Sequence, residues 1–253
     1  MIAQRARCLG SLLAAVVLTT ACTHYYEIPI ETPIRPKLDT SGFQRVLVAG
    51  FIAGGLEDVD GNLETTRLLR SQLRSKSDLR VIDADTLPLM EVVAADRARA
   101  SGEAPAALPP IKEDKDLEPY EPLFGNTAYW KQIGEEYQQP LIVTGTIMFT
   151  TEERSSSILR PVETRDQFGR RDTQTQRVYA ERRVFILKPR FIFIDGRTGE
   201  TLDIQTYKEE NSHNASQQTP ALSSYFDLMD RLIPNILGTL SSQKVKGTRF
   251  LLQ

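Results

Sequence analysis

The first 22 residues set the strongest limit on what this chain can fold into, because most of them are not expected to belong to the folded protein. Arg5 and Arg7 precede an uncharged, mostly apolar run from Leu9 to Ala21, which ends at Cys22. A basic start, a short apolar stretch and small residues at its end are typical of a secretory signal peptide. At about a dozen residues, the run is well short of the roughly 20 that a membrane-spanning helix needs. We therefore predict that residues 1–21 are removed.

The end of this segment, Val17-Leu18-Thr19-Thr20-Ala21-Cys22, resembles the lipobox of bacterial lipoproteins. The resemblance implies that the Cys22 thiol receives a diacylglyceryl group and that Cys22 becomes the new N-terminus. Thr19 departs from the pattern, since leucine usually stands three residues before the cysteine. Thr23 is not the aspartate that retains lipoproteins at the inner membrane of enteric bacteria, which implies an outer-membrane anchor facing the periplasm. A plain signal peptide with an incidental cysteine, or a core helix, are the alternatives.

Composition excludes several functions for the mature chain. Cys8 and Cys22 are the two cysteines, so lipidation of Cys22 leaves none for a disulfide, for catalysis or for a metal. Loss of Arg5 and Arg7 reduces Lys plus Arg from 31 to 29 against 33 Asp plus Glu, a formal net charge of −4. Nucleic-acid-binding domains are usually strongly basic. We expect neither a nucleic-acid partner nor a cofactor.

Proline spacing separates a tether from the rest of the chain. Pro29, Pro33 and Pro36 lie close together within residues 22–41. Proline fixes φ and removes a hydrogen-bond donor, which predicts an extended segment that does not pack against other elements. The remaining residues, 42–253, are numerous enough to bury a core as one domain.

Hydrophobic periodicity predicts an α+β domain in residues 42–253. Pro189 inside one expected strand indicates an edge position or a bulge, and Pro234 inside the last helix indicates a kink or a split. Gly102 to Pro122 reads as a long surface loop. The order of elements predicts a mixed β-sheet packed with helices in an α+β sandwich. Strands are expected at 45–52, 79–83, 141–150, 178–194, 202–207 and 248–252, and helices at 62–75, 87–100, 126–138 and 219–240, with Asn62 and Thr219 as N-caps.

One acidic turn has the composition of a calcium loop. Asp58, Asp60, Asn62 and Glu64 alternate around Gly61. Calcium binds six to eight oxygens, and such alternation brings side chains to one side. The spacing departs from that of a complete calcium loop. Acidic residues that precede a helix capped by Asn62 explain the same pattern through the helix dipole, so calcium remains a weak alternative here.

A segment of locally reversed charge lies between two strands that should pair. The polar, basic hairpin or insertion at residues 152–178 is flanked by further basic residues up to Arg190. It could meet an acidic protein surface, an anionic polysaccharide or lipid headgroups. A solvated hairpin tip whose charges protect a strand edge is the alternative. The residues we single out for partner binding are Arg165, Arg170, Arg171 and Arg177.

The sequence shows no recognisable set of catalytic residues. His24 falls in the tether and His213 in a polar stretch, and neither has the neighbours that a Ser-His-Asp triad requires. Gly50, Gly54 and Gly55 follow a strand, as in phosphate-binding loops, but the lysine and the threonine or serine of such loops are absent. We expect a protein that is not an enzyme.

Two longer stretches have recognisable patterns. Trp130 to Thr146 reads as a helix followed by a strand that ends in Gly-Thr, and Phe193 to Leu202 contains Asp195-Gly-Arg-Thr-Gly-Glu. Both stretches resemble the curli-secretion (CsgG-type) and TolB N-terminal-like families. The resemblance implies a CsgG/TolB N-terminal-like sandwich in a periplasm-facing lipoprotein. Several members form rings or serve as accessory factors in secretion or envelope assembly. This chain lacks the apolar membrane hairpins of the curli channel.

These observations lead to two functional hypotheses. The first is a non-enzymatic, outer-membrane-anchored factor that assists assembly or secretion through protein contacts, by self-association in a ring or with other envelope proteins. The second is a lipid-anchored binding protein that holds an anionic glycan or peptidoglycan through the basic hairpin.

Overall fold

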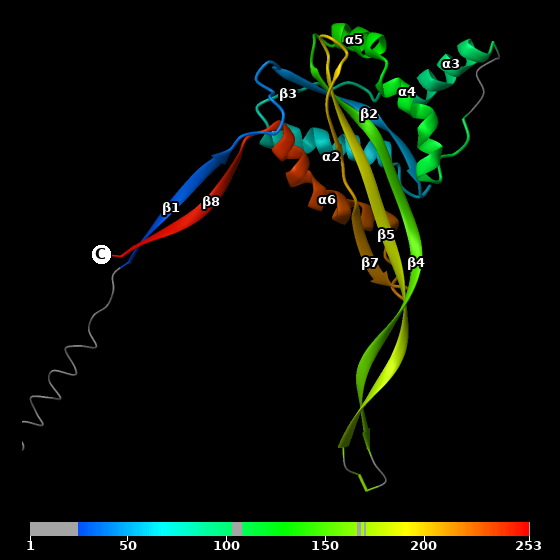
Figure 1. Cartoon of the computed structure of the whole chain (residues 1–253), viewed down its shortest axis with the longest axis vertical. Coiled ribbons are helices and arrows are strands. Elements are labelled where there is room, and N and C mark those ends of the chain that lie inside the picture. Colours follow the sequence, from blue (N-terminus) through cyan, green and yellow to red (C-terminus); the bar gives the residue numbers. More distant parts are fainter. Residues whose placement is uncertain (1–24, 103–107, 166–167, 170, 253) are drawn as a thin grey trace, which may run out of the picture. The chain divides into compact units, whose positions relative to one another are not determined.

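The computed structural model describes residues 25–102, 108–165, 168–169 and 171–252. The chain divides into two compact units, residues 36–241 and residues 1–35 with 242–253. Cys22 and Arg170 both lie outside the described residues. Figure 1 shows the elements of both units, which are described separately below.

The larger unit is built on a six-stranded mixed sheet. Its strands are β2 (Arg45–Gly55), β3 (Arg80–Val81), β4 (Leu141–Arg165), β5 (Arg171–Asp195), β6 (Thr201–Thr206) and β7 (Glu209–Asn214). The order is β3-β2-β4-β5-β6, and β7 pairs with β5 further along that strand. β3 and β4 lie parallel to β2, whereas β5, β6 and β7 join by antiparallel pairing.

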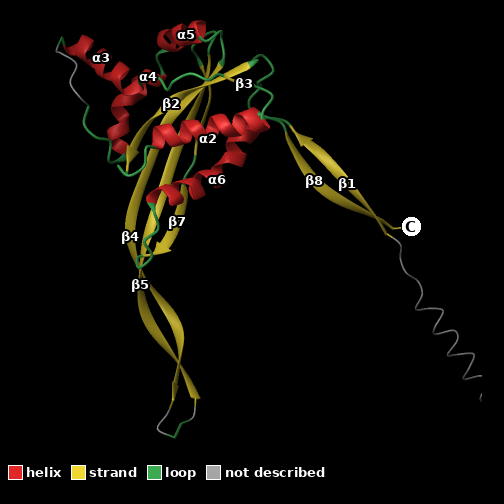
Figure 2. Ribbon diagram, turned by 180° about the vertical axis from the view of Figure 1, so that it is seen from behind, coloured by secondary structure: helices red, strands yellow, loops and turns green. Residues whose placement is uncertain are grey.

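Helices cover both faces of this sheet. α2 (Gly61–Lys76) and α6 (Ala221–Leu240) pack on one face, and Figure 2 shows them lying side by side. The other face packs against α3 (Leu89–Ser101), the 3₁₀ helix η1 (Asp114–Tyr120), α4 (Glu121–Phe124) and α5 (Thr127–Glu136). Val46 and Val48 of β2 enter the first core, and Leu47 and Ala49 enter the second. The structure confirms the predicted α+β class.

Several predicted element boundaries are wrong. Asp60, not Asn62, is the N-cap of α2, and its carboxylate accepts from Leu63 N at 3.0 Å. α6 begins at Ala221 after Pro220, so Thr219 is not its N-cap. The helix is continuous through Pro234 and is not split in two there. The expected loop at 102–122 contains η1 and the start of α4.

Pro189 occupies a gap between two strand partners. β6 pairs with β5 as far as Arg190, and β7 pairs with it from Leu187 onward. On its other side Pro189 lies opposite Ile147 of β4. Proline cannot donate to a ladder, so it lies where one partner strand ends and the next begins.

The smaller unit is a two-stranded antiparallel ribbon. β1 (Tyr25–Ile34) pairs with β8 (Gln243–Leu252) along its whole length, from Tyr25 opposite Leu252 to Ile34 opposite Gln243. The prolines predict an unpaired tether here, and the sequence places the last strand in the single domain of residues 42–253. In the structure these two segments pair with each other instead. Pro29 and Pro33 are four residues apart, so their backbone nitrogens lie on the same edge of β1. The outer edge of a two-stranded ribbon has no partner strand, so a proline there costs no hydrogen bond.

Within the described residues, no helix combines the length and the hydropathy that a membrane crossing requires.

Candidate interaction site

The acidic turn serves the fold at the start of α2. The Asp60 carboxylate caps the helix, and the Glu64 carboxylate lies 3.7 Å from Arg67 one turn later. Asp58 is exposed. The structure therefore does not gather the four predicted calcium ligands around one point, and within the described ranges no three His, Cys, Asp or Glu side chains come together as metal ligands would.

Asn62 holds an irregularity in the central strand. The register of β2 against β4 shifts between Val48 and Gly50, where Gly50 has a φ of +111°. Asn62 Oδ1 accepts a hydrogen bond of 2.7 Å from the Phe51 backbone N–H. Thr144 Oγ1 donates to the Gly50 carbonyl at 2.9 Å. Because a bulge shifts the alternation of side chains by one, Phe51 joins the same core as Val46 and Val48.

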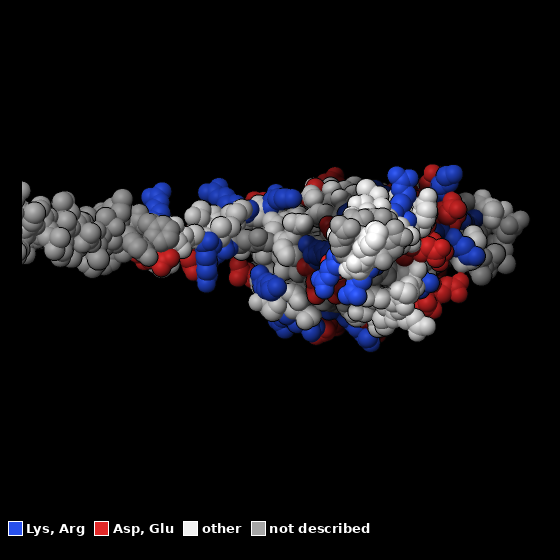
Figure 3. Space-filling model, turned by 90° about the horizontal axis from the view of Figure 1, so that it is seen from below, with Lys and Arg blue, Asp and Glu red and all other residues white. Residues whose placement is uncertain are grey.

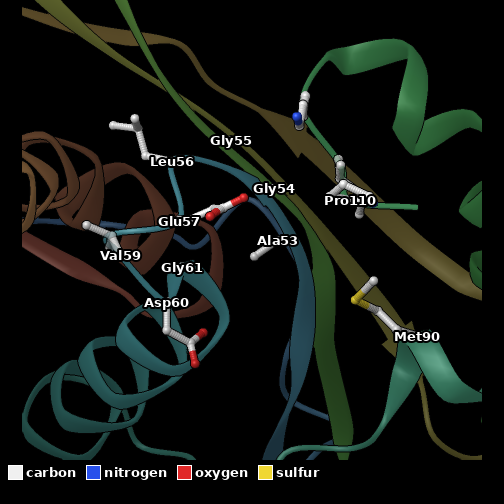
Figure 4. A pocket seen from close by; sticks show the side chains of 12 residues that line it. Ala53, Gly54, Gly55, Leu56, Glu57, Val59, Asp60, Gly61, Met90 and Pro110 are labelled. Atoms are coloured by element: carbon white, nitrogen blue, oxygen red, sulfur yellow. The ribbon is translucent and has the colours of Figure 1, made fainter. Parts of the chain in front are cut away.

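A small pocket of about 260 Å³ lies between the end of β2 and the start of α2 (Figure 4). Its acidic side chains are Glu57 and Asp60, and Figure 4 shows that their carboxylates do not converge. The segment at Ile111 covers the glycines, since a Cβ on Gly54 would lie 2.4 Å from Ile111 Cγ2. The Gly55 N–H donates to the Ile111 carbonyl at 2.9 Å. Close packing accounts for the glycines that the sequence places where phosphate-binding loops occur.

His213 has a serine neighbour that the sequence did not reveal. Ser224 Oγ lies 3.4 Å from His213 Nε2. The ring of Phe185 also lies near the imidazole, with centroids 6.0 Å apart in an edge-on arrangement. Ser224 is fully buried, so its hydroxyl has no access to a substrate. The pair lacks the oriented base and the exposed nucleophile that covalent catalysis requires.

The basic segment divides into a neutralised base and a protruding arm. At the base, Arg154 donates from Nη1 to Glu210 at 2.9 Å and from Nη2 to Glu152 at 2.8 Å. Hydrogen bonds from Lys208 and Arg154 lower the pKa of the Glu210 carboxyl to about 2. Two more cations of the segment pair with carboxylates of helices on the second face of the sheet. Lys188 lies 2.6 Å from Asp114 of η1, and Arg190 pairs with Glu121 of α4.

The arm is the part of the β4–β5 hairpin that lies beyond the third strand. β7 last pairs with β5 at Arg182, and Ala215 N donates to the Glu181 carbonyl at 2.9 Å. From Ser155 to Ala180 the described hairpin consists of two strands alone, with no helix packed on it (Figures 1 and 2). Its described part of β4 is about 35 Å long at roughly 3.3 Å per residue.

Three of the four predicted binding residues lie in the described part of the arm. Arg165 stands opposite Arg171, and Arg177 stands opposite Leu159. Residues directly opposite in an antiparallel pair share a face, and so do residues two apart along a strand. Arg165, Arg171 and Arg177 therefore share one face of the twisted arm. Among the side chains that the structure describes, no carboxylate forms an ion pair with these three.

The arm also exposes large apolar side chains, which sequence reasoning missed. Leu159 is 67% exposed, Tyr179 is 74% exposed, and Phe168 near the tip is 72% exposed. By the register, Leu159 and Tyr179 lie on the same face as the three arginines. A leucine and a tyrosine in an otherwise polar hairpin were the available signal. Glu163, opposite Thr173, lies on this face as well. We call the face that carries Leu159, Tyr179, Arg165, Arg171 and Arg177 the arm face.

Opposite charges are mixed on the side of the molecule seen from below. Figure 3 shows basic and acidic side chains next to one another there, without one continuous basic area. This face therefore does not present the large positive field that would attract a uniformly anionic surface.

The turn that resembles a family motif is a structural element. Asp195 accepts from Arg197 at three points: backbone N at 2.8 Å, Nε at 2.9 Å and, through its second oxygen, Nη2 at 2.7 Å. These hydrogen bonds lower the pKa of the Asp195 carboxyl. The Arg197 guanidinium also lies over the Phe43 ring, 4.6 Å from its centroid.

Comparison with known proteins yields similar structures but no family. No protein-family model matches the sequence, and no curated protein matches it significantly. The LpoB C-terminal domain from Salmonella enterica is 10% identical with a TM-score of 0.31, covering 70% of this chain and 84% of that one. Lipoprotein GNA1162 from Neisseria meningitidis is 10% identical with a TM-score of 0.32, covering 75% and 98%. The hypothetical protein CT253 from Chlamydia trachomatis is 11% identical with a TM-score of 0.37, covering 78% and 98%. Similarity at this level assigns no function, and the resemblance to the CsgG-type family stays a hypothesis.

Proposed function

We propose that this chain is a non-enzymatic lipoprotein of the bacterial envelope, which assists assembly or secretion by binding another envelope protein through its arm. The observation that carries the proposal is the exposed pair Leu159 and Tyr179 among arginines on the arm face. Tyrosine and arginine are enriched at protein interfaces and dominate their binding energy, whereas exposed apolar groups on an isolated arm bring no folding benefit. Cys22 would supply the outer-membrane anchor.

The same residues argue for a protein partner over an anionic glycan. A polyanion would be held chiefly by the arginines and would bind more weakly with salt. A protein partner would bury the tyrosine and the leucine and would lose most of its affinity when these side chains are shortened.

Site-specific photo-crosslinking in intact cells tests the proposal. A photoreactive residue at position 159 or 179 should crosslink to one defined envelope protein, and the same residue at position 222 should not, because Leu222 is an exposed leucine on α6 outside the arm. Absence of any protein crosslink at 159 and 179 would contradict the proposal. A crosslink between two copies of this chain would identify the partner as the chain itself.

Two sets of variants separate the candidate ligands. The double change Leu159→Ser and Tyr179→Ser should reduce binding at least about tenfold, as expected for interface residues worth more than 1 kcal/mol each. Leu222→Ser is the matched control. If binding survives this change but is lost in Arg165→Glu, Arg171→Glu and Arg177→Glu, the anionic-glycan hypothesis replaces the protein partner.

Self-association is a separate part of the hypothesis. The lipidated protein, solubilised in detergent, should elute as a ring-sized oligomer if the chain works as its family resemblance implies. A strict monomer removes the ring and leaves the arm proposal intact.

A further inference from the structure

The two-stranded ribbon has one apolar and one charged face. Residues of β1 at even positions share a face with their partners in β8. On this face Ile28 is 42% exposed, Ile34 is 51% exposed and Val245 is 50% exposed, with Ile30 half-buried between them. We call this the isoleucine face.

The opposite face of the ribbon carries its acidic residues. Glu31 lies 3.5 Å from Lys244 and 3.8 Å from Lys246, and Glu27 is on the same side. The isoleucine face has no carboxylate among its described residues, and its charged residue is Arg249, opposite Ile28. Among the described side chains, one face is therefore largely apolar with a single cation, and the other carries a network of ion pairs.

A ribbon of this kind is not stable by itself in water. Two strands without a covering layer are marginal, because too little apolar surface is buried to offset the ordering of the chain. The isoleucine face exposes branched side chains that a third layer would normally cover. An occupant that covers this face would therefore stabilise the ribbon.

The closeness of the ribbon to Cys22 in the sequence indicates what covers the isoleucine face. Tyr25, the first residue of β1, is three residues after Cys22, so it lies within about 10 Å of the anchoring thiol along the chain. Resting on the proposed lipidation of Cys22, we propose that the isoleucine face lies on the bilayer surface and is a second membrane contact beside the acyl chains.

The chemistry of the face agrees with this placement. Interfacial segments bury one apolar face at the boundary of headgroups and acyl chains, and long cationic side chains reach back to the headgroups. Arg249 stands where it can do so, and Glu27 and Glu31 point away from an anionic surface.

Tryptophan fluorescence tests this contact without a lipid anchor. The mature chain carrying Cys22→Ser is mixed with vesicles of phosphatidylethanolamine and phosphatidylglycerol. The natural Trp130 is fully buried and gives a constant background. Emission from Ile34→Trp should shift to the blue when vesicles are added. Emission from Thr248→Trp, on the opposite face of the ribbon, should not shift.

Charge substitutions give a second measurement. Ile28→Glu with Val245→Glu should reduce flotation with these vesicles at least about tenfold, since each change replaces an apolar contact by a charge. Thr248→Glu adds a charge on the other face and should float like the parent. Amide hydrogen exchange of β1 and β8 shows whether each variant keeps the ribbon.

The outcomes separate this inference from the proposed function. Equal shifts of both tryptophans, or none, overturn the membrane contact. A blue shift of Ile34→Trp that needs no vesicles and grows with protein concentration assigns the face to a second copy, which also overturns it. None of these results bears on whether Cys22 is lipidated in cells, because the variant has no thiol there.

Discussion

At the residue scale, Asn62 and Asp195 each anchor a part of the backbone that packing alone does not hold. Asn62 accepts from the Phe51 N–H beside the bulge of β2, and Asp195 fixes the turn between β5 and β6 through Arg197. The sequence pointed to both residues, but for other reasons: Asn62 as a helix cap or calcium ligand, and Asp195 as part of a motif. Neither contact could be derived from sequence, because each partner is set by how the strands and turns fold back.

The change Asn62→Ala should lower the free energy of unfolding by about 1–3 kcal/mol, because it leaves the Phe51 N–H unsatisfied in a partly buried site. Chemical denaturation measures this. Asp58→Ala, at an exposed position in the same turn, should change it by less than about 0.5 kcal/mol. Addition of calcium or of a chelator should leave the melting temperature of the parent unchanged. A clear rise with calcium would show that the turn is a metal site after all.

The ion pair of Asp195 predicts a pH dependence. A lowered pKa in the folded state means that the ionised carboxylate stabilises the fold above the unfolded pKa of about 4, and that this stability is lost as the pH falls through the folded value. Asp195→Asn should therefore cost about 1 kcal/mol at pH 7, a modest value because the Arg197 side chain is half-exposed. The difference from the parent should shrink below about pH 4.

Denaturation curves between pH 3 and pH 8 measure this difference. Glu200→Gln, an exposed carboxyl in the same turn, is the control and should show no comparable loss at pH 7. A cost for Asp195→Asn that is constant with pH would rule out the charge as its cause.

At the element scale, strong apolar stripes were predicted well, whereas the polar strand β7 and the proline-rich strand β1 were missed. Trp130 and Ile133 lie on the buried side of α5, as their spacing predicts. β7 is the polar sequence Glu-Glu-Asn-Ser-His-Asn, and it forms a strand only because β5 offers it an edge. β1 was missed for a related reason, since its partner β8 is more than 200 residues away in sequence.

The arm should be dispensable for folding. Replacing residues 156–180 by Asn-Gly joins Ser155 to Glu181, which already face each other in the register, through a favourable two-residue turn. The described arm lies beyond both buried cores, so the melting temperature should change by only a few degrees. Calorimetry measures this.

The same shortened protein should fail to bind the partner found by crosslinking at Tyr179. Loss of folding on removal of the arm would mean that the arm is part of the core. Normal partner binding without the arm would place the contact elsewhere on the molecule.

At the scale of the whole molecule, three features carry the proposals: the proposed lipidation of Cys22, a ribbon that begins three residues later, and a larger unit from which the arm protrudes. The sequence predicted the fold class and the hairpin that the structure shows, whereas the anchor at Cys22, outside the described residues, stays a prediction. It did not predict the ribbon, because its two strands are more than 200 residues apart in sequence. Leu159 and Tyr179 were visible in the hairpin sequence but were not singled out. Each part of the proposed function requires that the chain is held at a membrane through Cys22.

Mass spectrometry of the protein extracted from cell membranes tests that requirement directly. The account predicts an N-terminal peptide that begins at Cys22 and carries the mass of a diacylglyceryl group on its sulfur. A mature chain that begins elsewhere, or a Cys22 with a free thiol, would contradict it.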